Sequence, residues 1–256
     1  MQGRWGREEG GPDVSLPKLV ALYRPDTSSW LALTLDPIFR ADIAELAPVE
    51  PLADPFGLRY LSFTEGGAAR SWALRYQRQA GPAGTVTGAL AWQDVEGLLI
   101  DTQDPSMTGL PGRTLVGDGH RWVADVACER WLADGISGRL WLRWQDSEGD
   151  FPELALTDMA WPYVPEWQAG GRVDYLDRAG WRVGLEGIWV GERPHDPAGT
   201  IVVPDYFVVN LNARYQRNLH ETYFIQVRNL TDEGYQTWLG FPQSGITIYG
   251  GVQYRH

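Results

Sequence analysis

The sequence contains a single cysteine, Cys128, among 256 residues. One cysteine excludes an internal disulfide and a zinc site built from several cysteines, and a small buried apolar residue is the prediction for Cys128. No run reaches the roughly 20 apolar residues that a membrane-spanning helix needs. The opening MQGRWGREEGGPDV also lacks the apolar stretch of a signal peptide. Either the protein is cytoplasmic, or its true amino terminus precedes this sequence.

Positive charge is scarce, since the net charge is −11. This balance excludes a basic nucleic-acid surface and a polybasic patch for anionic lipid. Aromatic residues are abundant by contrast, with 13 Trp, 11 Tyr and 7 Phe. They predict a wide interfacial surface, either a ligand cleft or the aromatic belts of a membrane protein.

Helical periodicity is nearly absent, and apolar and polar residues alternate instead. In DYFVVNLNARYQR, for example, Phe207, Val209 and Leu211 share one face, and Asn210 and Asn212 share the other. We count about eleven such runs, which predict an all-β protein. They begin near Leu16, Ser28, Ala69, Gly84, His120, Gly135, Val164, Gly180, Asp205, Leu219 and Gly245.

The length and the polar faces of these runs favour a membrane barrel over a soluble sandwich. Soluble strands usually last about 5–6 residues, whereas these last about 10–13, the length of a tilted membrane-crossing strand. The middles of the apolar faces carry no charge, as a lipid-facing surface requires. The polar faces carry pairs of charges, namely Arg172 with Asp174, Arg182 with Glu186, and Asp125 with Glu129.

The connections alternate strictly between short and long. The long ones run from Pro37 to Ala68, Glu96 to Gly119, Asp146 to Tyr163, Glu192 to Pro204 and Thr231 to Ser244. Short periplasmic turns and longer outer loops are typical of outer-membrane barrels. We therefore predict an antiparallel transmembrane β-barrel of the outer-membrane type with about 11–12 strands.

The strand count indicates a partial barrel. Bacterial single-chain barrels have even strand numbers, and counting back eleven strands from a periplasmic carboxy terminus starts the first strand on the outer side. The expected division is a disordered leader at 1–15 and a carboxy-terminal barrel portion at 16–256.

The last residues resemble those of a known family. YFVVNLNARYQ followed by YFIQVRNLTDEGYQTWLGFPQSGITIYGGVQYR resembles the carboxy-terminal end of TonB-dependent outer-membrane receptors. The resemblance rests on Val227, Asn229, Leu230, Asp232 and Tyr235, followed by a Gly/Pro-containing loop and a final aromatic-tipped strand. It departs from the family at His256, where Phe is usual, and shows no plug domain or TonB box ahead of the strands.

The resemblance implies a receptor barrel of the bacterial outer membrane that imports a scarce nutrient, such as a siderophore, cobalamin or a glycan. Its implied partners are outer-membrane lipid and the barrel-insertion machinery. TonB would be a partner only if a plug domain is supplied upstream, and the small-molecule ligand is unknown. No cofactor and no nucleic acid are expected.

The residues of the motif also have a local interpretation. Asn229 and Asp232 suit a turn, because short polar side chains bond nearby backbone and tolerate unusual dihedral angles. Tyr235 and Trp238 are then expected at the outer membrane rim as amphipathic anchors.

Catalytic and metal-binding patterns are missing. His120, His195, His220 and His256 have no partner at metal-ligand spacing, and the acidic run from Asp101 to Gly109 does not match a calcium loop. Asp118, His120 and Ser147 could in principle form a catalytic set, but nothing in their spacing along the sequence selects them. We expect no enzyme activity, no catalytic residue and no metal.

Five inward-facing residues form the candidate binding surface: Asn210, Asn212, Arg214, Gln226 and Arg228. They predict a hydrated lumen wall that contacts a solute or a plug, or that only stabilises the lumen.

Two alternatives to a receptor barrel remain open for the protein as a whole, a small self-contained porin-like barrel and a soluble β-rich carbohydrate-binding module.

Overall fold

The computed structural model describes residues 19–38, 62–80, 84–102 and 113–254. The predicted leader at 1–15 lies outside these ranges. Sixteen strands and one 3₁₀ turn are found in the described residues. They are β1 Leu19–Tyr23, β2 Ser29–Ile38, β3 Ser62–Gln79, β4 Gly84–Thr102, β5 Arg113–Ala133, β6 Ile136–Phe151, η2 Pro152–Leu154, β7 Leu156–Met159, β8 Trp167–Leu176, β9 Trp181–Val190, β10 Arg193–Pro194, β11 Val202–Val203, β12 Tyr206–Gln216, β13 Glu221–Arg228, β14 Gln236–Trp238, β15 Phe241–Pro242 and β16 Thr247–Tyr254.

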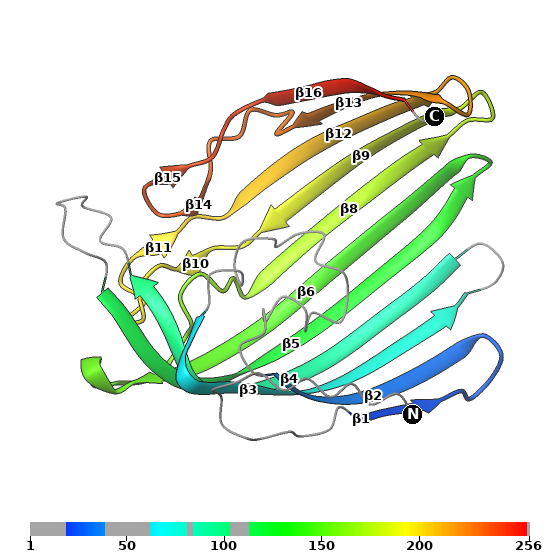
Figure 1. Cartoon of the computed structure of the whole chain (residues 1–256). Helices are drawn as coiled ribbons and strands as arrows, with labels where there is room; N and C mark the ends of the chain where they lie inside the picture. Colours follow the sequence, from blue (N-terminus) through cyan, green and yellow to red (C-terminus); the bar gives the residue numbers. More distant parts are fainter. Residues whose placement is uncertain (1–18, 39–61, 81–83, 103–112, 255–256) are drawn as a thin grey trace.

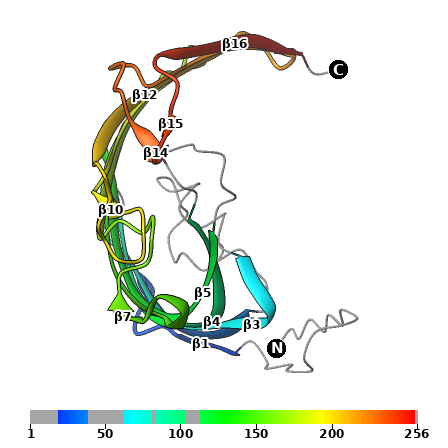
Figure 2. The same cartoon turned by 90° about the vertical axis from the view of Figure 1, so that its left-hand side faces the viewer.

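Twelve of these strands form one antiparallel sheet. Eleven follow one another as neighbours in the order β1-β2-β3-β4-β5-β6-β8-β9-β12-β13-β16, and β7 pairs with β6. The sheet curves into an open trough with β1 at one edge and β16 at the other (Figures 1 and 2). The predicted fold class and strand number are confirmed.

The predicted alternation of the connections is visible in Figure 1. The short turns after β1, β5, β8 and β12 lie at one end of the sheet, and the connections that carry β7, β10, β11, β14 and β15 lie at the other. Two of the short turns contain glycines with positive φ, Gly135 at 73° and Gly180 at 95°. At both glycines a Cβ would come within 2.4 Å of a backbone oxygen.

Three strands are much longer than the predicted 10–13 residues. β3, β4 and β5 have 18, 19 and 21 residues. Their pairing continues past irregularities, for example from Val95↔Gly119 to Leu98↔Gly117, into stretches assigned to loops from sequence. The strand ladder therefore extends beyond the predicted barrel wall. In this extension the backbone N–H and C=O groups bond to the neighbouring strand instead of to water.

The convex face is apolar. Leu140 is 69% exposed and Trp72 is 48% exposed on this face, and no layer of described residues covers them. The strand register places the polar side chains on the concave face, several of them buried, including Arg121, Asp125, Arg143, Gln145 and Gln168. A sandwich would bury the tryptophan-bearing faces between two layers, so the interpretation as a soluble sandwich is wrong.

Two aromatic belts bound the convex apolar face. The belt near the long connections consists of Trp72, Trp92, Trp122, Trp144, Trp167, Trp189 and Phe207, several of them direct cross-strand partners. Near the short turns, Trp181 stacks on Tyr215 at 4.7 Å, and Tyr215 lies 6.5 Å from Tyr223. Trp181 and Trp189 are eight residues apart on β9, which is about 26 Å along the strand and about 20 Å along the barrel axis at a tilt of about 40°.

Cys128 is exposed, so the prediction that it is buried is wrong. It follows Val126 in the alternation of β5 and therefore shares the convex face, where a small apolar side chain suits lipid.

The described part of the chain contains no helix long and apolar enough to cross a bilayer.

Candidate functional site on the concave wall

The five candidate wall residues lie on one face of neighbouring strands. Asn210, Asn212 and Arg214 alternate along β12, and Gln226 and Arg228 do so on β13, with Asn212 directly opposite Gln226. Arg228 lies over the ring of Tyr249, 5.4 Å from its centroid. The structure thus brings these side chains together on the concave face, and their role in binding stays a prediction.

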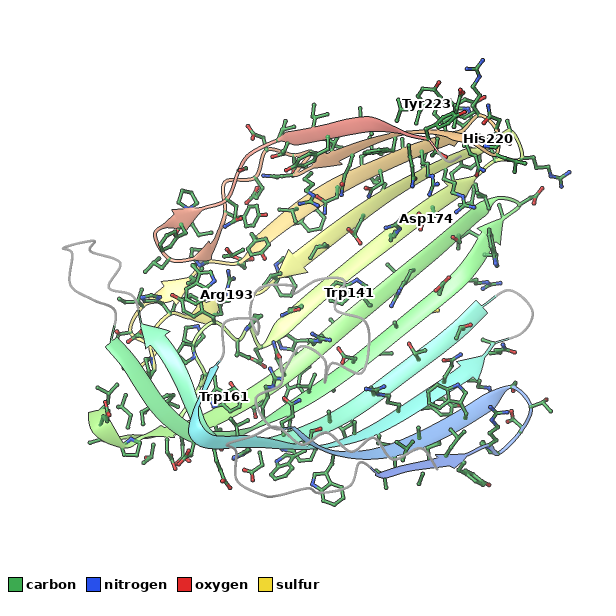
Figure 3. The ribbon with its side chains drawn as sticks, in the orientation of Figure 1. Trp141, Trp161, Asp174, Arg193, His220 and Tyr223 are labelled. Carbon is green, nitrogen blue, oxygen red and sulfur yellow. The ribbon has the colours of Figure 1, made fainter. Side chains whose placement is uncertain are left out.

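Ion pairs and amide contacts order the rest of the wall. Arg172 donates two hydrogen bonds of 2.7 Å to the carboxylate of Asp174, which confirms that predicted pair. A Cβ at Gly184 would lie 2.6 Å from Asp174 Oδ1, so a larger residue at this position would displace the ion pair from its present geometry. Asp174 and Trp141 both lie on this face (Figure 3).

Asp125 is paired differently from the prediction. Its Oδ1 accepts a 2.6 Å hydrogen bond from Nε of Arg143, and both side chains are buried. Asp125 and Glu129 share a face, but they are like charges two alternations apart. Among the described residues Arg182 and Glu186 form no ion pair, because four residues along a strand separate them by about 13 Å.

Three long connections meet at the other end of the wall. Tyr163, in the β6–β8 connection, stacks on Trp238 of β14 at 4.3 Å and bonds through its hydroxyl to Nδ1 of His195. Arg193 of β10 donates to the carbonyl oxygens of Gln236 at 2.8 Å and Thr237 at 3.0 Å. The β6–β8, β9–β12 and β13–β16 connections are therefore held together by side-chain contacts, and Figure 3 labels Arg193 among them.

Tyr235 and Trp238 do not anchor the outer rim, so that prediction is wrong. Tyr235 lies 4.4 Å from Tyr206 and packs against the cluster of Ile188, Val190 and Val208 on the concave face. β14 and β15 lie on the inner side of the trough (Figure 2). Aromatic character alone does not reveal this, because the indole and phenol rings also suit a protein interior.

The belt residues hold the rim instead. The indole N–H groups of Trp144 and Trp167 both donate to Oε1 of Glu166, at 3.3 and 3.0 Å. Trp189 donates to Oδ2 of Asp205 at 3.1 Å. These contacts satisfy the polar end of each indole at the boundary of the apolar face.

The Asn-Leu-x-Asp motif closes the end of β13, as predicted. Asn229 and Asp232 both have positive φ, 53° and 54°. Asn229 is 3% exposed, its Oδ1 accepts from the amide of Glu233 at 2.8 Å, and its Nδ2 donates to the carbonyls of Glu233 at 2.9 Å and Ser244 at 3.3 Å. Asp232 Oδ1 accepts from the amide of Ile246 at 3.1 Å. The two side chains replace backbone partners between β13 and β16.

The possible catalytic set is not assembled. Arg121 is the cross-strand partner of Ser147 and His120 is that of Glu148, so Ser147 and His120 lie on opposite faces. His120 instead lies 3.5 Å from Glu148, and Asp118 accepts from the amide of Gly97 at 2.6 Å. The described residues contain no group of three or more His, Cys, Asp or Glu suited to a metal. Most of the acidic run from Asp101 to Gly109, and His256, lie outside the described ranges.

Two groups in the long connections have shifted pKa values, Asp196 between β9 and β12 and Tyr235 between β13 and β16. Partial burial raises the pKa of Asp196, but hydrogen bonds from the Thr200 hydroxyl and the Ile201 amide lower it by more, so its pKa falls below the ordinary value. Burial raises the pKa of Tyr235.

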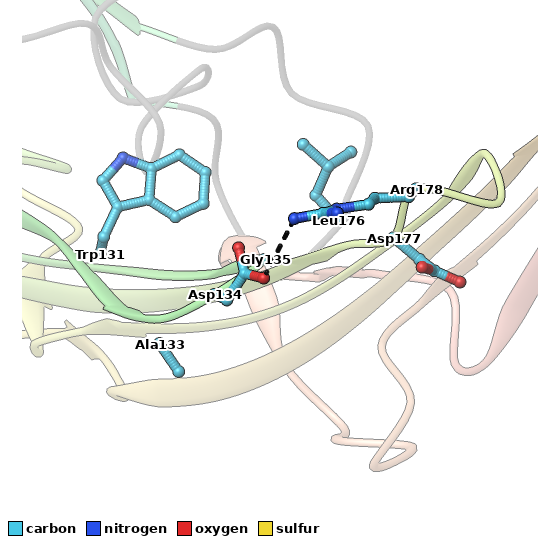
Figure 4. A pocket seen from close by; sticks show the side chains of 7 residues that line it. All are labelled: Trp131, Ala133, Asp134, Gly135, Leu176, Asp177 and Arg178. Atoms are coloured by element: carbon cyan, nitrogen blue, oxygen red, sulfur yellow. Dashed lines mark ion pairs between the residues drawn. The ribbon is translucent and has the colours of Figure 1, made fainter.

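Two hollows border the wall. One, of about 640 Å³, lies between the β6–β8 and β9–β12 connections and is lined by residues that include Ser147, Glu192 and Arg193. The other, of about 550 Å³, lies at the short-turn end, where Trp131 and Leu176 stand on the same side of the sheet beside the Asp134–Arg178 ion pair (Figure 4).

Comparisons with known proteins agree with this geometry. Residues 129–230 match the family model described as TonB dependent receptor-like, beta-barrel. No curated protein sequence matches the chain. The fold is similar to that of the ferric-catecholate import receptor Fiu from E. coli K12, at 16% identity and a TM-score of 0.60, covering 93% of this chain and 34% of Fiu.

Two further receptor structures have the same fold. The pyoverdine outer membrane receptor FpvA from Pseudomonas aeruginosa PAO1 is 14% identical, with a TM-score of 0.61 and coverage of 94% of this chain and 36% of FpvA. The siderophore receptor PiuA from Acinetobacter baumannii is 15% identical, with a TM-score of 0.61 and coverage of 91% and 34%. The chain thus spans about a third of the length of the solved receptors that it matches.

The family consists of outer-membrane receptors and transporters, which agrees with the predicted localisation and with the prediction that the chain is not an enzyme. Residues 129–230 are thus similar to a TonB-dependent receptor-like β-barrel, and the sheet that contains them has the fold of outer-membrane receptor barrels.

Proposed function

We propose that this chain forms part of the wall of an outer-membrane receptor that takes up a scarce nutrient with energy relayed through TonB. The observation that carries the proposal is the opposite chemistry of the two faces of one curved sheet. The convex face is apolar between two aromatic belts, and the concave face carries Arg, Asn and Gln side chains. Such a wall separates lipid from an aqueous interior.

The transported nutrient would be a siderophore, cobalamin or a glycan, and an iron–siderophore complex is the candidate that we propose first. Structures with the same fold support this order, because they include a ferric-catecholate import receptor and a receptor bound to pyoverdine. Asn210, Asn212, Arg214, Gln226 and Arg228 would contact the hydrated solute. Their amide and guanidinium groups can donate to its oxygen atoms.

The proposed function also involves further strands, the barrel-insertion machinery and TonB. β1 and β16 each have one neighbouring strand in the described sheet, and further strands would complete the barrel. The barrel-insertion machinery would place it among outer-membrane lipids. Contact with TonB would belong to a plug-like segment in the lumen.

The test is uptake by cells that lack the gene for this chain. Such cells are supplied with labelled ferric catecholate, ferric hydroxamate, cobalamin or a glycan, with and without TonB. We expect uptake of one compound to be lost, and to return when the gene is restored only if TonB is present. Uptake that returns without TonB would instead indicate the porin-like alternative, and unchanged uptake of all four would refute the proposal.

A further inference from the structure

The concave wall is more positive than the chain as a whole. On the strand residues whose side chains the structure describes, this face carries eight arginines and four carboxylates, although the net charge of the chain is −11. The arginines are Arg75, Arg121, Arg139, Arg143, Arg172, Arg182, Arg214 and Arg228, and the carboxylates are Asp125, Glu129, Asp174 and Glu186. The inner surface therefore attracts anions.

Two of these arginines face each other directly near the short turns. Arg182 of β9 is the cross-strand partner of Arg214 of β12, and both are exposed. Directly opposite residues have Cβ atoms about 4.5–5.5 Å apart, and like charges in such a pair destabilise the sheet. A negative group bound between the two guanidinium groups would offset this repulsion.

The protein itself does not supply that group in the described residues. The carboxylate of Asp174, one alternation along the wall, accepts both of its hydrogen bonds from Arg172. Glu186 is the cross-strand partner of Arg172 and Asn210, not of either exposed arginine. Glu221 bonds to Arg217 in the neighbouring turn. Arg182 and Arg214 have no carboxylate within ion-pair distance among the described residues.

An apolar surface adjoins the pair. Leu176 is the cross-strand partner of Arg182, and with Trp131 it lines the hollow of about 550 Å³ at the same end (Figure 4). Leu176 and Trp131 are 42% and 51% exposed. The site thus presents two guanidinium groups beside an exposed indole and an exposed leucine.

We propose that Arg182 and Arg214 form an anion-binding site for a carboxylate- or phosphate-bearing group that enters the short-turn end of the lumen. Guanidinium groups bind the oxygen pairs of such anions through parallel hydrogen bonds. The anion can belong to a small solute or to an acidic peptide segment. The site requires only that this wall face water, so it does not depend on nutrient uptake or on TonB.

The test is calorimetric titration of the full chain folded in detergent micelles. The probes are citrate, inorganic pyrophosphate and hexaglutamate, with hexaglutamine as the uncharged control. We expect at least one anion to bind, to weaken as salt is added, and to bind at least tenfold more weakly to Arg182→Gln/Arg214→Gln. Citrate or pyrophosphate binding alone assigns the site to a small solute, and hexaglutamate binding alone assigns it to an acidic segment.

The matched control is Arg78→Gln/Arg217→Gln. These arginines lie at the same end, Arg78 on the convex face and Arg217 in a turn where it pairs with Glu221. The control removes the same charge and is expected to bind within twofold of the parent protein. Each single variant, Arg182→Gln and Arg214→Gln, is expected to bind the anion at least threefold more weakly than the parent protein. The single variants serve as the test if the double variant does not fold. Absence of binding by all three anions, or equal binding by the variants that remove the pair, would overturn the proposal.

Discussion

Replacement of Asn229 by alanine is expected to destabilise the protein through the turn that follows β13. The side chain is 3% exposed and makes two short hydrogen bonds with the backbone of Glu233, at 2.8 and 2.9 Å, and a longer one with Ser244 at 3.3 Å. Two short bonds contribute about 1 kcal/mol each. Alanine at a φ of 53° adds about 1 kcal/mol, because its Cβ crowds the following carbonyl in the left-handed region.

The free energy of unfolding is therefore expected to fall by about 3 kcal/mol in Asn229→Ala. The assay is urea unfolding in lipid vesicles, followed by tryptophan fluorescence. Asn229→Gly is the matched variant, since it removes the same side-chain bonds but accepts the left-handed backbone. It is expected to be about 1 kcal/mol more stable than the alanine variant. If Asn229→Ala unfolds at the same urea concentration as the parent protein, the side-chain bonds do not hold this turn and the reasoning fails.

Further substitutions test the two faces of the wall and the loop end. Arg143→Met is expected to cost about 3–5 kcal/mol, because it leaves the buried Asp125 carboxylate without its partner, and Asp125→Leu in the same protein should recover most of that loss. Leu142→Arg places a charge on the convex face and should cost about 2–4 kcal/mol in vesicles, whereas Ser137→Arg on the concave face should cost far less; equal costs would contradict the assignment of the faces. The lowered pKa of Asp196 stabilises the fold above the ordinary value of 3.8 and that contribution is lost as the pH falls through the folded pKa, so the urea midpoint of the parent protein should drop in that range and that of Asp196→Asn should drop less.

The strands of the sheet were predictable because alternation and turn residues act locally. Ten of the eleven expected starts fall on or near a strand of the main path, from Ser28 against Ser29 to Gly245 against Thr247, and the eleventh, Leu16, lies outside the described ranges just before β1. The convex position of Trp72, Leu74 and Tyr76 followed from the same alternation. The long arms of β3, β4 and β5 did not, because pairing between distant segments, rather than local pattern, extends those strands.

The candidate site was predictable only in part. Alternation placed Asn210, Asn212 and Arg214 on one face, and composition identified that face as polar. Register between strands is needed to see that Arg182 faces Arg214, and that Arg143 rather than Glu129 meets Asp125. The inward packing of Tyr235 and Trp238 depends on how three connections fold over one another, which no single stretch of sequence specifies.

The direction of the two edge strands has a consequence for any seam that would close the trough. Neighbours along the path from β1 to β16 are all antiparallel, and β16 is the eleventh strand, so β1 and β16 run the same way. A direct seam between them, within one molecule or between two molecules related by rotation about the barrel axis, would therefore be a parallel ladder with slanted hydrogen bonds. An antiparallel seam requires an odd number of strands to lie between these two edges.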